Sequence, residues 1–154
     1  MKKIYLTALF LVINFGGLAL GSYLMNDGAT SAWYNNLNKA PWTPPGWVFG
    51  AAWSLIMVCF SVYLAYLFSL RNSKFVVTIY SIAVILNISW NYFFFNQNHT
   101  SIALVNISAL TLVIFYLYIS FRDDDLSKMK YLLLPYLIWL CIATSLNGYV
   151  VFNN

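Results

Sequence analysis

The residues of this sequence that could do chemistry are tryptophans with small neighbours about one helical turn away. Trp139, Ala143 and Leu146 stand at positions i, i+4 and i+7, so they share one face of a helix. A bulky ring followed by a small side chain forms a slot on such a face. A buried tryptophan also needs a hydrogen-bond partner for its indole N–H. This face is therefore suited to hold and orient an aromatic ligand.

Two further segments repeat this pattern. Asn87, Trp90 and Phe94 stand at i, i+3 and i+7, and the amide of Asn87 adds a hydrogen-bonding group to the aromatic face. Gly50 precedes Trp53 by three residues, so a glycine leaves space beside that indole. Faces of this kind occur both in ligand cavities and in ordinary aromatic cores. From spacing alone, both interpretations stay open.

The sequence contains few residues that could act as acid–base catalysts or metal ligands. The sequence has no Glu, and its one histidine, His99, lies in a short loop between apolar segments. One histidine cannot assemble a zinc site, and a Ser-His-acid set cannot form inside spans that hold no charge. Cys59 and Cys141 fall in the middle of apolar runs, where single thiols act as small apolar fillers. We expect no metal site, no cofactor and no acid–base hydrolase.

The apolar segments that carry these residues are long enough to cross a membrane. The chain of 154 residues is 62% hydrophobic and 8% charged, with a mean hydropathy of +0.73. So few polar side chains cannot cover a water-facing surface. Each apolar run reaches the roughly 20 residues that span a hydrocarbon core. The sequence predicts an all-α membrane protein, a single-domain bundle (residues 1–154) of five transmembrane helices over 4–25, 47–70, 75–95, 101–121 and 131–152.

The basic residues predict the orientation of this bundle. One side holds all but one of them: Lys2, Lys3, Arg71, Lys74, Arg122, Lys128 and Lys130. The opposite side holds only Lys39, so the positive-inside rule predicts a plasma-membrane protein with a cytoplasmic N-terminus and an outer C-terminus. The N-terminal apolar run is longer than the roughly 7–15 residues of a signal-peptide core, and we expect it to be retained as a helix. Basic residues only flank the spans, which favours the lipid bilayer as a partner and excludes nucleic acid.

The longest connection, residues 26–46, leads into an unusual proline- and tryptophan-rich stretch. Pro44 and Pro45 lack backbone N–H groups and suit the first turn of a helix, where such donors have no partner. They predict a sharp transition from loop to helix that holds Trp42 and Trp47 near the outer interface. A hinge alone would not need so many indoles.

Three blocks of the sequence resemble one known family. They are W-T-P-P-G-W-V-F-G-A-A-W (42–53), L-N-I-S-W-N-Y-F-F-F (86–95) and L-P-Y-L-I-W-L-C-I-A-T-S-L-N (134–147). In order and spacing they resemble the translocator protein family, called tryptophan-rich sensory proteins in bacteria and formerly peripheral benzodiazepine receptors. The resemblance covers essentially the whole chain.

The resemblance implies a five-helix bundle, often a homodimer, with a pocket near the first loop. Members bind tetrapyrroles such as protoporphyrin IX and drug-like ligands of the benzodiazepine and isoquinoline types. Some bacterial members are thought to degrade protoporphyrin IX in light. The resemblance therefore implies a porphyrin receptor, and it leaves open photo-oxidation, transport of apolar molecules, or a sensor or scaffold role. The small residues Gly17 and Gly21 favour close helix packing, within the bundle or at a dimer face.

Carried over by position, the resemblance assigns a ligand site to both the first loop and the helices. Trp53 and Trp139 would be the redox-relevant pair. The chain departs from the family at Ala51, where proline is usual, and at Asn106, where some relatives have aspartate. It also lacks the basic residue of the sterol-type motif, which argues against sterol binding. The expected ligand-binding residues are Tyr23, Asn26, Trp33, Pro44, Trp47, Phe49, Gly50, Trp53, Asn87, Trp90, Trp139, Ala143 and Leu146.

Overall fold

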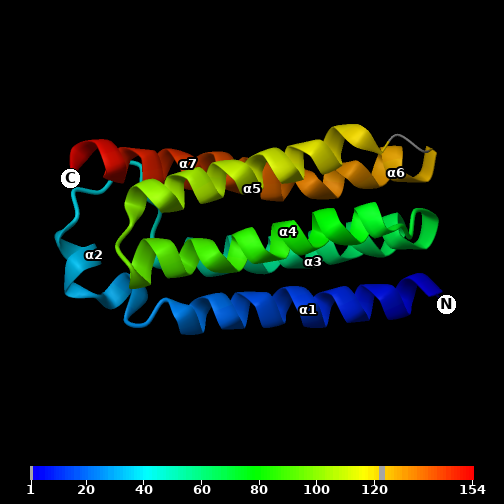
Figure 1. Cartoon of the computed structure of the whole chain (residues 1–154), viewed down its shortest axis with the longest axis horizontal. Helices are drawn as coiled ribbons and strands as arrows, with labels where there is room; N and C mark the ends of the chain where they lie inside the picture. Colours follow the sequence, from blue (N-terminus) through cyan, green and yellow to red (C-terminus); the bar gives the residue numbers. More distant parts are fainter. Residues whose placement is uncertain (1, 122–123) are drawn as a thin grey trace.

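The computed structural model describes residues 2–121 and 124–154, and most of this part of the chain is helical, with no strand (Figure 1). Arg122, one of the basic residues used to predict orientation, lies outside the described residues. The α-helices are α1 (Lys2–Leu24), α2 (Ala32–Asn36), α3 (Gly46–Leu70), α4 (Lys74–Asn91), α5 (Thr100–Ser120), α6 (Asp124–Met129) and α7 (Leu134–Asn153). Two 3₁₀ turns, η1 (Gly28–Thr30) and η3 (Lys130–Leu133), and a π-helical turn, η2 (Tyr92–Asn96), complete them.

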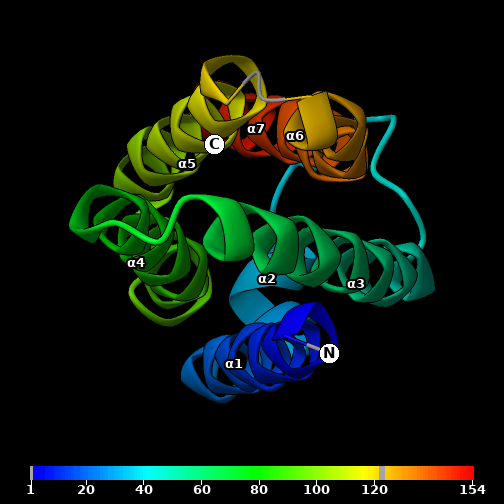
Figure 2. The ribbon, with the colours of Figure 1, turned by 90° about the vertical axis from the view of Figure 1, so that its right-hand side faces the viewer.

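Within the described residues, five helical segments are long and apolar enough to cross a membrane, which confirms the predicted five-helix bundle. They run side by side, and the two termini lie at opposite ends (Figure 1). Viewed end on, the bundle has three layers: α1, then α3 with α4, then α5 with α7 (Figure 2). The short helix α2 lies at the end that also carries the C-terminus.

Local sequence signals explain where several helices begin. The side chain of Ser73 accepts a hydrogen bond from the backbone of Val76 and caps α4, as expected for serine at this position. Helix α3 starts immediately after Pro45, and α7 has a proline in its first turn, where a missing N–H costs nothing. Two segments differ from the predicted pattern: residues 28–36 of the first connection are partly helical, and α7 is preceded by α6 and η3.

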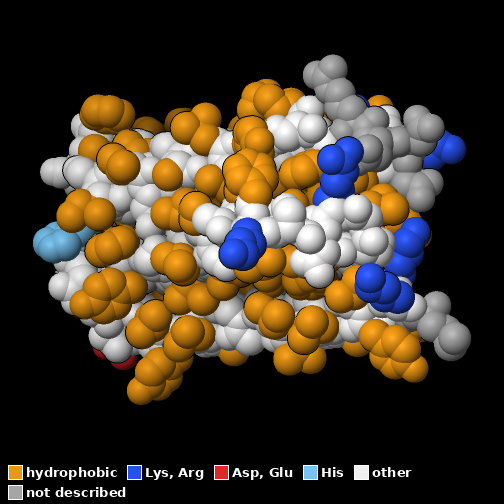
Figure 3. All heavy atoms as spheres, turned by 45° about the vertical axis from the view of Figure 1, so that its right-hand side comes forward, with side chains coloured by type: hydrophobic (Ala, Val, Ile, Leu, Met, Phe, Trp, Pro, Cys, Tyr) orange, Lys and Arg blue, Asp and Glu red, His pale blue; other side chains and the backbone are white. Residues whose placement is uncertain are grey.

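The buried core lies where the three layers meet. Its largest fully buried side chains come chiefly from α3, α5 and α7, including Tyr63, Leu110 and Tyr136. Many apolar side chains instead point outward, as expected for helices that face lipid rather than water (Figure 3). Figure 3 also shows most of the visible Lys and Arg side chains toward the end of the bundle opposite His99.

The two spaced glycines of α1 lie against α4. A Cβ at Gly17 would lie 3.6 Å from the side chain of Ile88, and one at Gly21 would lie 2.6 Å from Nδ2 of Asn91. The lack of a side chain at Gly21 thus lets the two helices approach closely. Of the two roles left open by the sequence, these contacts show packing inside the bundle.

Candidate functional site

A hollow lies beneath the first connection, at the end of the bundle that carries α2. We call it the outer hollow. Its free volume, open mouth included, is about 450 Å³. Its lining comes from the first connection, α3, α4 with η2, and α7: Tyr34, Lys39, Ala40, Thr43, Phe49, Trp90, Phe94, Phe95, Ala143, Leu146, Asn147 and Val150.

One wall of the outer hollow is aromatic. The rings of Trp90 and Phe94 are stacked, with centroids 5.2 Å apart and an interplanar angle of 19°. Phe95 meets Phe94 edge-on at 4.9 Å, and Trp33 also meets Phe94 edge-on, at 5.6 Å. The π-helical turn η2 carries both phenylalanines; such turns add a residue to the helix and frequently occur at functional sites. The result is a closely packed aromatic wall, in which Phe94 itself is buried.

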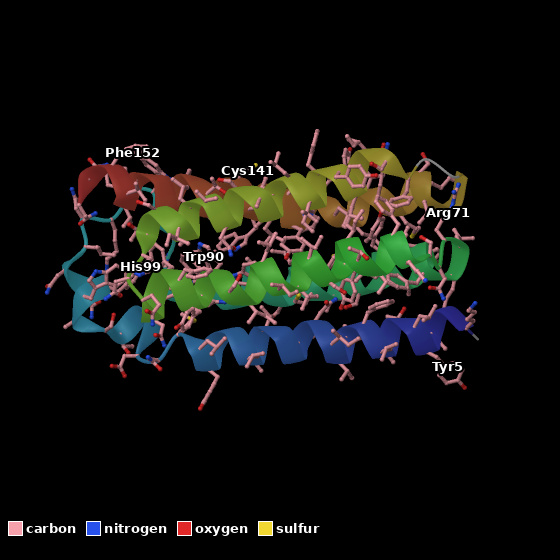
Figure 4. The ribbon with its side chains drawn as sticks, viewed as in Figure 1. Tyr5, Arg71, Trp90, His99, Cys141 and Phe152 are labelled. Carbon is pink, nitrogen blue, oxygen red and sulfur yellow. The ribbon has the colours of Figure 1, made fainter. Side chains whose placement is uncertain are left out.

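Hydrogen bonds fix the indole of this wall. Trp90 Nε1 donates to Oδ1 of Asn147 over 3.1 Å, and Nδ2 of Asn147 donates to the carbonyl of Thr100 over 2.9 Å. Figure 4 shows Trp90 in the space between α4 and the α5–α7 layer. Asn147 is buried, and these two hydrogen bonds give both of its polar atoms a partner within the bundle. The ring of Trp90 is therefore held in one orientation before any ligand arrives.

The mouth of the outer hollow is cationic. Lys39 contributes the one charged side chain of its lining, and its Nζ lies 4.4 Å from the centroid of the Tyr34 ring. Burial raises the pKa of the Tyr34 hydroxyl above its ordinary value, so this group stays neutral. A neutral aromatic ring beside an ammonium, with no carboxylate in the lining, favours an anionic group on the ligand.

Two contacts hold the first connection onto α7, and we call them the latch. The Oδ1 of Asn154 accepts a hydrogen bond from the backbone N–H of Asn38 over 2.8 Å, and its Nδ2 donates to the Asn38 carbonyl over 3.2 Å. Trp42 donates from Nε1 to Oγ of Ser145 and meets the ring of Tyr149 edge-on. The segment between these points includes Lys39 and Ala40, so the latch keeps the mouth in place.

Four of the sequence-predicted residues line the outer hollow directly: Phe49, Trp90, Ala143 and Leu146. Sequence reasoning did not assign Asn147, although it stands one turn after Ala143 on the same helical face. Extending that face by one turn would have found it.

Three other predicted residues lie behind the outer hollow. Trp139 is 5% exposed and packs edge-on against Phe49 at 5.2 Å; its indole N–H has no partner among the described residues. Trp53 packs edge-on against Tyr136 at 5.8 Å. Asn87 donates from Nδ2 to the hydroxyl of Tyr136 over 2.6 Å. These side chains support the base of the site and form no part of its lining.

The remaining predicted residues are not brought to the outer hollow. Tyr23 is 81% exposed at the end of α1, and Trp47 is 75% exposed at the start of α3. Asn26 and Gly50 are also exposed, and Pro44 is half-buried in the loop-to-helix transition. Helical rotation explains Trp47 and Gly50, because Phe49 and Trp53 occupy the inward side of the same turns.

The described side chains form no group of three His, Cys, Asp or Glu that could hold a metal ion. Cys59 and Cys141 are both free thiols.

Comparison with known proteins gives a family for this architecture. A family model described as the TspO/MBR family matches residues 8–152. The chain is 33% identical to the "Tryptophan-rich protein TspO" of Archaeoglobus fulgidus, over 100% of this chain and 99% of that protein. It is 33% identical to the "Tryptophan-rich sensory protein" of Cereibacter sphaeroides, over 75% and 72% of the two chains. It is also 30% identical to the human "Translocator protein", over 90% and 83%.

Proposed function

The chain belongs to the TspO/MBR family, and we propose that it is a membrane receptor whose outer hollow binds porphyrins, protoporphyrin IX first among them. One observation carries this proposal: aromatic rings and small residues line one hollow, and a single cation is part of the same lining. A porphyrin is a flat apolar ring with carboxylates at one edge. The ring suits the wall of Trp90 and Phe94, and the carboxylates suit Lys39.

The same wall suits smaller planar ligands of the benzodiazepine and isoquinoline types. These ligands need no cation, so their binding should depend on Trp90 and Ala143 and not on Lys39. This difference separates recognition of the ring from recognition of the carboxylates.

The orientation of the chain in the membrane is also part of the proposal. Lys39 lies on the side with the fewest basic residues, so the outer hollow would open to the outside of the plasma membrane. A membrane-impermeant thiol reagent applied to intact cells would then label Lys39→Cys and not Lys74→Cys. Labelling in the reverse order would contradict this orientation.

Protoporphyrin IX titrated into the detergent-purified full chain, in the dark, tests the site. Binding should quench tryptophan fluorescence saturably, because the ring would lie against Trp90. The variant Ala143→Phe fills the outer hollow and should weaken binding at least about tenfold, the effect of losing roughly 1.4 kcal/mol. Ala51→Phe adds the same ring on an exposed face and is the matched control. Equal binding by both variants would show that the outer hollow is not the binding site.

The ester of the same porphyrin tests the role of Lys39. Protoporphyrin IX dimethyl ester keeps the ring and loses both charges. An ion pair at a partly exposed site is worth about 0.2–1 kcal/mol, so the wild type should prefer the acid by up to about fivefold. Lys39→Gln should remove this preference while binding the ester normally. If Lys39→Gln still prefers the acid over the ester, a group other than Lys39 binds the carboxylates.

Light-dependent oxidation of the bound porphyrin is a second candidate function, which Trp139 behind the hollow favours. In such a step the illuminated ring excites dioxygen, which adds across one carbon–carbon double bond; the O–O and C–C bonds break and two carbonyls form. Dioxygen is the oxidant and supplies both oxygen atoms. Trp53 and Trp139 would hold in position the side chains at the base of the site.

Illumination of the bound porphyrin in air tests this second function. A product heavier than the porphyrin by one dioxygen, formed with the protein and not with free porphyrin, would support it. Trp53→Phe and Trp139→Phe should change the yield or the product. If both variants convert porphyrin as the wild type does, the tryptophans have no part in the reaction. If only flux across sealed vesicles is found, in the dark, the protein is a transporter.

A further inference from the structure

We propose that the end of the bundle that carries the N-terminus binds an anionic phospholipid, whose headgroup is held by Lys3 of α1 and Lys74 of α4. We call these two lysines, together with the exposed apolar side chains of Ile4, Tyr5 and Phe75 that follow them, the lipid seat. It lies at the opposite end of the bundle from α2 and the outer hollow (Figure 1). The proposal therefore does not depend on porphyrin binding.

Helix packing places the two lysines of the lipid seat at the same level. Helices α1 and α4 begin at the same end of the bundle and run in the same direction (Figure 1). In three neighbouring pairs the α4 residue stands 70 or 71 positions after its α1 partner: Phe10 with Tyr80, Gly17 with Ile88, and Gly21 with Asn91. Lys74 stands 71 positions after Lys3, so the same register, extended by about two turns from Phe10, gives both lysines one level.

Neither lysine of the lipid seat has a carboxylate partner among the described side chains. Lys3 is half-buried, and its Nζ lies 4.0 Å from the centroid of the Tyr66 ring on α3. Lys74 is exposed as the first residue of α4. The one acidic side chain that the structure describes, Asp27, lies in the first connection at the opposite end. Both ammonium groups thus keep their charge for an external anion, and the ring of Tyr66 holds that of Lys3 in place.

The positive charge at this end of the bundle is concentrated on the side of the lipid seat. Segment 122–130, at the same end, has three basic and three acidic residues, so its formal charge is zero. The start of α1 and the turn between α3 and α4 hold four basic residues and no acidic one: Lys2, Lys3, Arg71 and Lys74. An anion at the membrane surface is therefore attracted to α1 and α4 rather than to the segment that precedes α7.

The neighbours of the lysines favour a lipid over a soluble anion. Ile4 and Tyr5 follow Lys3, Phe75 follows Lys74, and all three apolar side chains are exposed. Figure 4 shows Tyr5 pointing away from the bundle. A phospholipid has the same order of parts, a charged headgroup followed by acyl chains, so one molecule contacts both the lysines and the apolar side chains. A soluble anion would contact the lysines alone.

The charge of the headgroup separates anionic from zwitterionic lipids. A lysine near an anionic membrane surface gains about fivefold in binding. Phosphatidylcholine carries a phosphate as well, but its quaternary ammonium places a second cation beside Lys3 and Lys74. The lipid seat should therefore select phosphatidylglycerol over phosphatidylcholine with the same acyl chains.

Native mass spectrometry of the detergent-purified full chain, titrated with each of these two lipids, tests the proposal. The wild type should bind phosphatidylglycerol at least about fivefold more tightly than phosphatidylcholine, and Lys3→Gln and Lys74→Gln should each lower this preference by up to about fivefold. Lys128→Gln removes an equally exposed lysine at the same end and is the matched control for Lys74→Gln. The control should keep the preference. Lys74→Gln, at an exposed position, remains informative if Lys3→Gln fails to fold.

Three results would overturn the proposal. A wild type that binds both lipids equally would show that this end does not select anionic headgroups. Equal losses in Lys74→Gln and Lys128→Gln would show that the charge of the whole end, and not the lipid seat, attracts the lipid. Glycerol phosphate that displaces phosphatidylglycerol at a similar concentration would show a site for soluble anions, in which the apolar neighbours have no part.

Discussion

Replacing Asn154 with alanine should speed both the arrival and the release of porphyrin at the outer hollow without changing its affinity. The side chain of Asn154 makes two hydrogen bonds to the backbone of Asn38, in the segment that covers the mouth. If the ligand passes when this segment lifts, the latch must break first. The latch is present in the closed protein with and without ligand, so its loss raises the open population in both states equally.

The size of the effect follows from the exposure of these bonds. A hydrogen bond contributes about 0.5–1.5 kcal/mol net, and exposed ones fall at the low end. Both bonds to Asn38 are exposed, and Trp42 still holds the segment through Ser145. We therefore expect a loss of about 1 kcal/mol, which raises both rates by about fivefold.

Stopped-flow quenching of tryptophan fluorescence by protoporphyrin IX measures both rates. Asn153→Ala is the matched control, because the Asn153 side chain bonds only to the carbonyl of Tyr149 within α7. Unchanged rates in Asn154→Ala would show that the ligand does not pass beneath this segment. A weaker affinity with an unchanged association rate would instead show that Asn154 acts on the bound ligand, and it would refute the latch.

Two further predictions concern the packing of α1, and both are checked by the midpoint of equilibrium unfolding in detergent. Gly16→Ala, with open surroundings, should raise the midpoint, because alanine favours a helix by about 1 kcal/mol over glycine; Gly21→Ala should raise it less, because its Cβ would lie 2.6 Å from Nδ2 of Asn91, which must turn away. Tyr80→Phe should cost about 1 kcal/mol, because Oδ1 of Asn14 loses its buried donor. Equal midpoints for Gly21→Ala and Gly16→Ala would contradict the contact assigned to Gly21, and an unchanged midpoint for Tyr80→Phe would contradict the one assigned to Tyr80.

The spans of this protein were predictable because the membrane imposes them. A hydrocarbon core demands long uncharged helices, and hydropathy alone identifies such segments. Helical spacing likewise brought Trp90, Ala143 and Leu146 to one site, since each lies within a regular helix. For the same reason, the continuation of that face to Asn147 was available from the sequence.

Other features depend on contacts that the sequence does not reveal. The π-helical turn at Tyr92–Asn96 changes the helical register, so a regular 3.6-residue period does not place Phe95 in the site. Trp139 and Asn87 share helical faces with site residues, yet rings from α3 and α7 separate them from the outer hollow. The path of the first connection depends on the distant side chain of Asn154, a contact across 116 residues of sequence.

A structure of the full chain determined with bound protoporphyrin IX would test the central claim most directly. We predict the ring against Trp90 and Phe94 in the outer hollow, with at least one carboxylate within hydrogen-bonding distance of Nζ of Lys39. A ring bound on the lipid-facing surface, or with its carboxylates turned away from the first connection, would contradict the account.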